Sequence, residues 1–150
     1  MPGQKVPIRE AAVKCPDKGM PATMSYVLNI DDKAFEDLIG QALDELPQAY
    51  VSRLLKDVAV TWASDPTPEQ RAELKLRGNQ TLFGLYEGRP LPQRFSGYGK
   101  ITPDKITIFK NPICVFSPDM HALKEQIKHT VWHEMAHYFG LDHKRIHELE

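Results

Sequence analysis

The segment from His133 to His143 reads HExxHxxGxxH, a spacing that can bring three imidazoles and one carboxylate to a single point. His133 and His137 are four residues apart, so on an α-helix they lie one turn apart on the same face. His143 would lie on the wrong side of a continuous helix, so the helix has to end before it. Gly140 permits this end, because glycine adopts the left-handed C-cap conformation without a steric cost.

Three imidazole ligands are typical of a catalytic zinc site, because they leave one coordination position open for water. Glu134 lies about 100° round the helix from His133, which places its carboxylate beside the metal rather than on it. From there Glu134 can take a proton from a water molecule at the open position and pass it to a leaving amine. We therefore predict one Zn²⁺ ion held by His133, His137 and His143, with Glu134 as the general base.

The motif resembles that of the metzincin zinc peptidases, in which three histidines bind zinc and the glutamate is the general base. Only residues 144–150 follow the third histidine, and none is methionine, so we do not expect the methionine turn of the metzincins. Over residues 31–149 the chain is more similar to a small bacterial family of zincin-like metallopeptidases. The similar segments occur in the family's order and are Phe35–Ile39 through Leu46–Pro47, then Leu82–Gly88, Pro103–Phe109 and the histidine motif.

This resemblance implies a compact minimal zincin that uses zinc to hydrolyse peptide bonds in a peptide or protein substrate. In that family the third ligand is often an aspartate, so Asp142 is the alternative to His143. Another class of function stays open, because a fold does not determine an activity. The chain can be a non-catalytic protein that binds zinc, or binds peptides, on a zincin scaffold.

The helix that positions the motif is predicted to run from Pro118 to Phe139, with Ser117 as its N-cap. Its apolar side chains recur every four residues on the side opposite the histidines, which predicts one face in the core and one along a cleft. They are Ile127, Val131, Met135 and Phe139.

Two further helices are predicted from capping residues. Asp31 or Asp32 begins a helix whose apolar residues keep the helical period as far as Leu46, before Pro47 interrupts it. Thr67, with Pro68 and Gln70 after it, begins a short helix that is predicted to run to Leu76 and to stop at Gly78.

Strands are predicted at residues 58–62, 82–86 and 106–109, and Asn111-Pro112 is predicted to turn the chain toward residues 113–116. The expected fold class is therefore α+β. It is a minimal zincin-like fold with a small, mostly antiparallel sheet packed with helices, and its active-site helix lies near the C-terminus.

The sequence leaves the supporting groups of the site open. Carboxylates that can accept the imidazole N–H groups are Asp142, Asp104 and Glu87. Donors for a developing oxyanion are Tyr86, which we rank first, Tyr98, Tyr138 and Arg94. Either of the strands at residues 82–86 and 106–109 can hold an extended substrate.

The 150 residues are the length of one domain. Residues 1–25 are rich in proline, glycine, lysine and alanine and show no sustained period, so we predict a disordered or extended arm there. Residues 26–150 are predicted to form the zincin-like metallopeptidase domain.

The composition is that of an ordinary soluble globular protein, with 41% hydrophobic residues, 26% charged residues and a formal net charge of −1. This balance predicts attraction neither to nucleic acid nor to a membrane surface. The chain shows no apolar run that could span a bilayer and no signal-peptide core, so we expect a cytoplasmic location. Cys15 and Cys114 are then expected to be free thiols.

Overall fold

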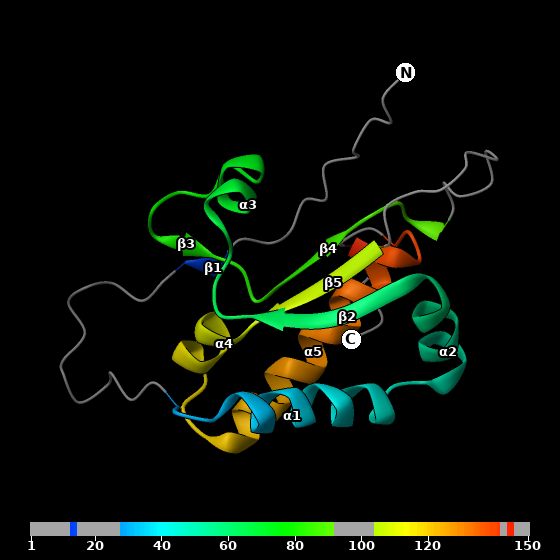
Figure 1. Cartoon of the computed structure of the whole chain (residues 1–150), viewed down its shortest axis with the longest axis horizontal. Coiled ribbons are helices and arrows are strands. Elements are labelled where there is room, and N and C mark those ends of the chain that lie inside the picture. Colours follow the sequence, from blue (N-terminus) through cyan, green and yellow to red (C-terminus); the bar gives the residue numbers. More distant parts are fainter. Residues whose placement is uncertain (1–12, 15–27, 92–103, 142–143, 146–150) are drawn as a thin grey trace.

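The structure is a computed structural model that describes residues 13–14, 28–91, 104–141 and 144–145. Figure 1 shows its helices and strands, which confirm the predicted α+β fold class. In chain order the elements are β1 (Val13–Lys14), α1 (Asp32–Glu45), α2 (Gln48–Asp57), β2 (Val58–Ala63), α3 (Pro68–Glu73), β3 (Gln80–Thr81), β4 (Gly84–Glu87), β5 (Asp104–Phe109), α4 (Lys110–Phe116) and α5 (Met120–Tyr138).

The main sheet has three strands in the order β2-β5-β4, with β5 in the centre. β2 runs parallel to β5, with Val58 opposite Asp104, whereas β4 runs antiparallel to β5, with Gly84 opposite Ile108. The sheet is therefore mixed rather than mostly antiparallel. The parallel pair requires a crossover, and the chain between β2 and β5 supplies it by way of α3, β3 and β4.

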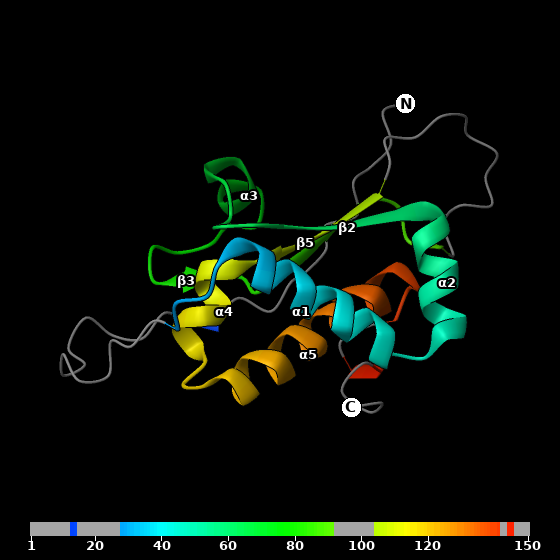
Figure 2. The ribbon, with the colours of Figure 1, turned by 60° about the horizontal axis from the view of Figure 1, so that its bottom comes forward.

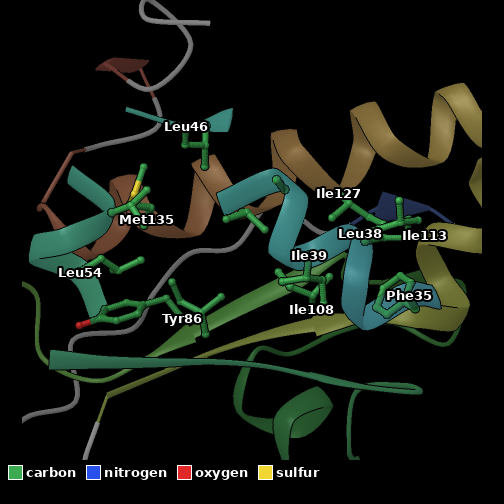
Figure 3. Close-up of a cluster of buried hydrophobic side chains, with 14 of the residues drawn as sticks. Phe35, Leu38, Ile39, Leu46, Leu54, Tyr86, Ile108, Ile113, Ile127 and Met135 are labelled. Carbon is green, nitrogen blue, oxygen red and sulfur yellow. The ribbon is translucent and has the colours of Figure 1, made fainter. Parts of the chain in front are cut away.

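The hydrophobic core lies between the sheet and the helices on one of its faces. α5 packs against β4 and β5, and α1 runs alongside α5 on the same side (Figure 2). Figure 3 shows how apolar side chains from both helices meet the sheet, for example Phe35 and Ile39 of α1 and Ile127 of α5 around Ile108 of β5. These four side chains are buried, so this layer holds α5 firmly against the sheet.

α1 begins where its cap predicts. Asp31 is the N-cap, and its carboxylate accepts a hydrogen bond of 2.7 Å from the backbone N–H of Ala34. The buried residues of this helix follow the predicted apolar period. Pro47 ends α1 as predicted, but a second helix, α2, which was not predicted, starts directly after it.

Several strand and helix boundaries differ from their predictions, among them those of α3 and β4. α3 has the predicted capping box, with Thr67 and Gln70 bonded reciprocally at 3.1 and 2.9 Å. It ends at Glu73 rather than Leu76, because Lys75 adopts a φ of 54° that a right-handed helix cannot continue through. The strand predicted at residues 82–86 is shifted, and β4 begins only at Gly84.

The turn predicted at Asn111-Pro112 is wrong, because the chain forms the helix α4 there. Pro112 lies in the first turn of α4, where a helix has no intrahelical acceptor for the N–H group that proline lacks. Ile113 and Cys114 are buried on this helix. A short apolar run can therefore be buried in a helix as well as in a strand.

The predicted arm, residues 1–25, lies outside the described residues except at Val13–Lys14. That dipeptide is β1, which pairs antiparallel with β3. The boundary between the arm and the domain at residues 25 and 26 stays a prediction. No helix in the described part of the chain combines the length and the apolar character that a bilayer span needs.

Candidate functional site

α5 carries the motif and begins two residues later than predicted. Asp119, not Ser117, is the N-cap, and its carboxylate accepts a hydrogen bond of 2.8 Å from the backbone N–H of Ala122. Ser117 instead donates its hydroxyl to the carbonyl of Ile113 at the end of α4. The prediction for the buried face is confirmed for Ile127, Val131 and Met135, which are fully buried, whereas Phe139 is partly buried against the same core.

His133 and His137 lie one turn apart on α5, and their ring centroids are 4.8 Å apart with an angle of 78° between the ring planes. Both side chains are half-buried. His129, one turn earlier, is exposed, and its ring centroid is 6.4 Å from that of His133. The helix thus brings the two predicted ligands together as an edge-to-face pair.

Glu134 is buried, with only 1% of its surface exposed, whereas the two histidines are half-buried. It lies where α5 contacts β4. A Cβ atom placed on Gly84 of β4 would be 3.2 Å from Cγ and 3.4 Å from Oε1 of Glu134, and 2.7 Å from Cγ2 of Thr130. Glycine at position 84 therefore allows the strand to approach the helix this closely. Gly84 was not among the predicted site residues, because its only signal in the sequence is a glycine inside an apolar run.

The end of the helix is a Schellman motif, as the glycine predicted. Gly140 has a φ of 80°, and its N–H donates to the carbonyl of His137 at 2.9 Å. The N–H of Leu141 donates to the carbonyl of Ala136 at 3.0 Å. The chain therefore turns away from the helix axis directly after the second histidine. His143 and its alternative, Asp142, lie outside the described residues.

Zinc fits the donors that the described residues provide. Two imidazoles one helical turn apart can occupy two of the four tetrahedral positions that zinc prefers. Within the described ranges, no group of three or more His, Cys, Asp or Glu side chains could hold a metal ion. His133 and His137 are thus the two predicted ligands that the described residues bring together, and the predicted third, His143, lies outside them.

The tyrosines proposed as oxyanion donors are engaged with carboxylates. Tyr86 is fully buried and donates its hydroxyl to Asp104, which also accepts a hydrogen bond of 3.3 Å from the backbone N–H of Arg89. Tyr138 donates its hydroxyl to Asp57 of α2 at 2.5 Å. A phenol has a single proton to donate, so in this arrangement neither tyrosine offers it to a substrate. Tyr98 and Arg94 lie outside the described residues.

Of the carboxylates predicted to orient the imidazoles, Glu87 lies on the edge strand β4 and interacts with α3 and β5. It accepts a hydrogen bond of 3.0 Å from Gln70, and its carboxylate is 3.8 Å from Lys105 Nζ. These contacts hold the Glu87 carboxylate between α3 and β5.

Similarity to known proteins bears on the family to which the chain belongs. The profile of a family described as zincin-like metallopeptidase matches residues 55–150, from the last residues of α2 through the histidine motif. A solved structure described as "Conserved hypothetical protein" from "Thermo thermophilus" is similar with 21% sequence identity and a TM-score of 0.49, over 73% of this chain and 94% of the other. No curated protein sequence matches the chain. Because the family profile covers well over half of its length, the chain belongs to the zincin-like metallopeptidase family.

Proposed function

We propose that the protein is a zinc-dependent peptidase that hydrolyses peptide bonds in a peptide or protein substrate. Its family supports metallopeptidase chemistry. The observation that carries the proposal is the position of Glu134, a buried carboxylate that directly follows one imidazole and lies against the edge strand β4. A general base needs a dry, fixed position close to the reacting water, and a buried carboxylate next to the motif imidazoles is in such a position.

In this proposal His133, His137 and His143 hold one zinc ion. Bound there, zinc supplies a Lewis acid that polarises the peptide carbonyl and makes water easier to deprotonate. Glu134 takes the proton from the attacking water molecule and delivers it to the nitrogen of the leaving amine. The contact between Glu134 and β4 keeps the carboxylate from rotating away between these two proton transfers.

The strand order favours β4 as the element that holds the substrate. β5 is paired on both sides, so it cannot accept another strand. Of the two strands that could hold an extended substrate, β4 is therefore the better candidate. β4 pairs with β5 on one side only, and no strand in the described ranges covers its other edge. An extended peptide that adds to this edge near Gly84 would bring its backbone close to Glu134.

The deciding experiment compares the wild-type protein with Glu134→Gln at matched zinc content. A mixed peptide library is incubated with each, and products are read by mass spectrometry. Glutamine keeps the shape of glutamate but cannot take the proton, so we expect the variant to bind zinc and to lose activity by about 10²-fold or more. His121→Ala is the control, because it removes an exposed imidazole from the first turn of the same helix.

Turnover close to wild type in Glu134→Gln would rule out this residue as the general base. Absence of cleavage by both proteins, with zinc bound in both, would favour the non-catalytic alternative, in which the scaffold binds zinc or peptides without hydrolysis.

A further inference from the structure

A hydrogen bond between residues far apart in the chain joins the last turn of α5 to α2. The hydroxyl of Tyr138 donates to Oδ2 of Asp57, the last residue of α2, at 2.5 Å. Arg53, one turn earlier on α2, has its guanidinium 3.6 Å from the same oxygen. The carboxylate is therefore held from its own helix while it accepts the tyrosine, and its side chain is only 25% exposed.

The ring of Tyr138 is held from the sheet side as well. It is fully buried and lies edge-to-face with Tyr86 of β4, with the ring centroids 6.2 Å apart. Tyr86 is itself bonded to the buried Asp104 at the start of β5. Figure 3 shows that Tyr86 lies at the same end of the core as Leu54 of α2 and Met135 of α5. The side chain of Tyr138 on α5 is therefore in contact with both α2 and β4.

Tyr138 directly follows His137 in the chain. The same turn of α5 contains the hydrogen bond from Gly140 to the carbonyl of His137 and ends the helix. A rotation of this last turn would change the direction of the His137 imidazole, because the side chain is fixed to the helix by short torsions. The Tyr138–Asp57 bond opposes such a rotation, since a bond to a charged acceptor is short and directional.

We propose that the Tyr138–Asp57 hydrogen bond is a positioning contact that sets the direction of His137 for zinc binding. Tyr138 and Asp57 act on the metal site through the helix and need not touch the metal or the substrate. The packing of the ring alone does not need the hydroxyl, because phenylalanine would fill the same space between α2 and β4. The inference rests on the proposed zinc site and adds two residues, one of them on a helix far from the motif in sequence.

The test is the zinc affinity of purified full-length protein, measured by competition with a chromophoric chelator. Tyr138→Phe keeps the ring and removes the donor, and we expect its zinc affinity to fall about tenfold, as is common for groups that orient a ligand. Asp57→Ala removes the acceptor from a partly exposed position and is expected to cause the same loss. The double variant is expected to lose no more than either single variant, because both substitutions break one interaction.

Three control variants separate positioning from general destabilisation. Tyr50→Phe removes a hydroxyl from a half-exposed tyrosine of α2 whose ring packs edge-to-face on Phe139, 5.4 Å between centroids. Lys128→Gln removes a partly exposed ion pair, with Glu45 of α1 3.2 Å away, from α5 itself. Ser117→Ala destabilises the fold at a buried hydrogen bond away from the histidines. We expect all three to bind zinc within about twofold of wild type.

The unfolding midpoint in urea, measured without metal, shows whether each variant is folded. A Tyr138→Phe or Asp57→Ala affinity equal to that of Tyr50→Phe would overturn the positioning role, as would additive losses in the double variant. Absence of zinc binding by the wild type would overturn the proposed zinc site, and this inference with it. The two failures are therefore distinguishable from the wild-type titration alone.

Discussion

Cγ of Glu134 lies 3.2 Å from the point where Gly84 would carry a Cβ atom, so a side chain at position 84 would crowd Glu134. This contact links the edge strand that we propose for substrate binding to the proposed general base. Any side chain at position 84 has to move Glu134, Thr130 or the strand itself. The distance between the carboxylate and the substrate backbone then changes.

We predict that Gly84→Ala retains zinc but lowers kcat at least tenfold, because a displacement of even 1 Å at a reacting group costs on the order of 10²-fold in rate. The measurement is peptide turnover at matched zinc content. Gly78→Ala is the matched control, since a Cβ atom there meets nothing within 4 Å. Full activity in Gly84→Ala would show that the carboxylate position tolerates a shift of the strand.

The third zinc ligand can be identified by substitution. We predict that His143→Ala lowers zinc affinity at least tenfold, because loss of one of three protein ligands removes a metal–nitrogen bond. Asp142→Ala is the comparison, and we expect it to have the smaller effect. The measurement is chelator competition on both variants. The reverse order of affinities would assign the third position to Asp142.

Two features favour glycine at position 88, the positive φ of its backbone and the close approach of the buried Asp104. Its φ is 156°, and a Cβ atom would lie 2.2 Å from Cγ of Asp104. We predict that Gly88→Ala lowers the free energy of unfolding by about 3 kcal/mol, from overpacking together with backbone strain. Urea unfolding, with Gly40→Ala as the control in open space, checks the value. A loss below about 1 kcal/mol would mean that the strand end relaxes easily.

Cys114 gives a prediction for alkaline pH. Burial raises the pKa of its thiol above the ordinary value of 9.0, and the charge of Lys110 offsets only part of this shift. Above pH 9.0 the unfolded thiol therefore loses its proton while the folded thiol keeps it. The stability that this difference supplies is complete below 9.0 and is lost as pH rises through the higher folded pKa.

We therefore expect the free energy of unfolding to fall above pH 9.0 more steeply in the wild type than in Cys114→Ala, as linkage requires. Equal slopes would contradict a raised thiol pKa. The same burial predicts slow alkylation: in a Cys15→Ser background, Cys114 should react with iodoacetamide only after unfolding in urea.

Local signals in the sequence predicted much of this structure. Asp31, Thr67 and Gly140 act within a few residues of themselves, and each occupies the cap that its chemistry favours. Where two local signals compete, position is harder to predict. Ser117 and Asp119 are both good caps, and only the hydrogen bond from Ser117 to α4 decides between them.

Contacts between distant residues were beyond the sequence patterns. No local sequence pattern predicts that Tyr138 donates a hydrogen bond to Asp57, or that Gly84 lies against Glu134. Ile113 and Cys114 form a short apolar run that suits a strand or a helix equally, and the core around α4 selects the helix. The pattern thus identified candidate ligands and a candidate base, while their positioning depends on tertiary packing.

The parallel pairing of β2 with β5 has a consequence for how the chain folds. Val58 cannot pair with Asp104 until the intervening segment, with α3 and β4, has been brought back to the same place. Closing so long a loop costs entropy before any strand contact compensates for it, whereas β4, β5 and α5 are nearer neighbours in the chain. We therefore expect the half of the sheet that supports the histidine helix to form early, and β2 to be added in the slow step of refolding.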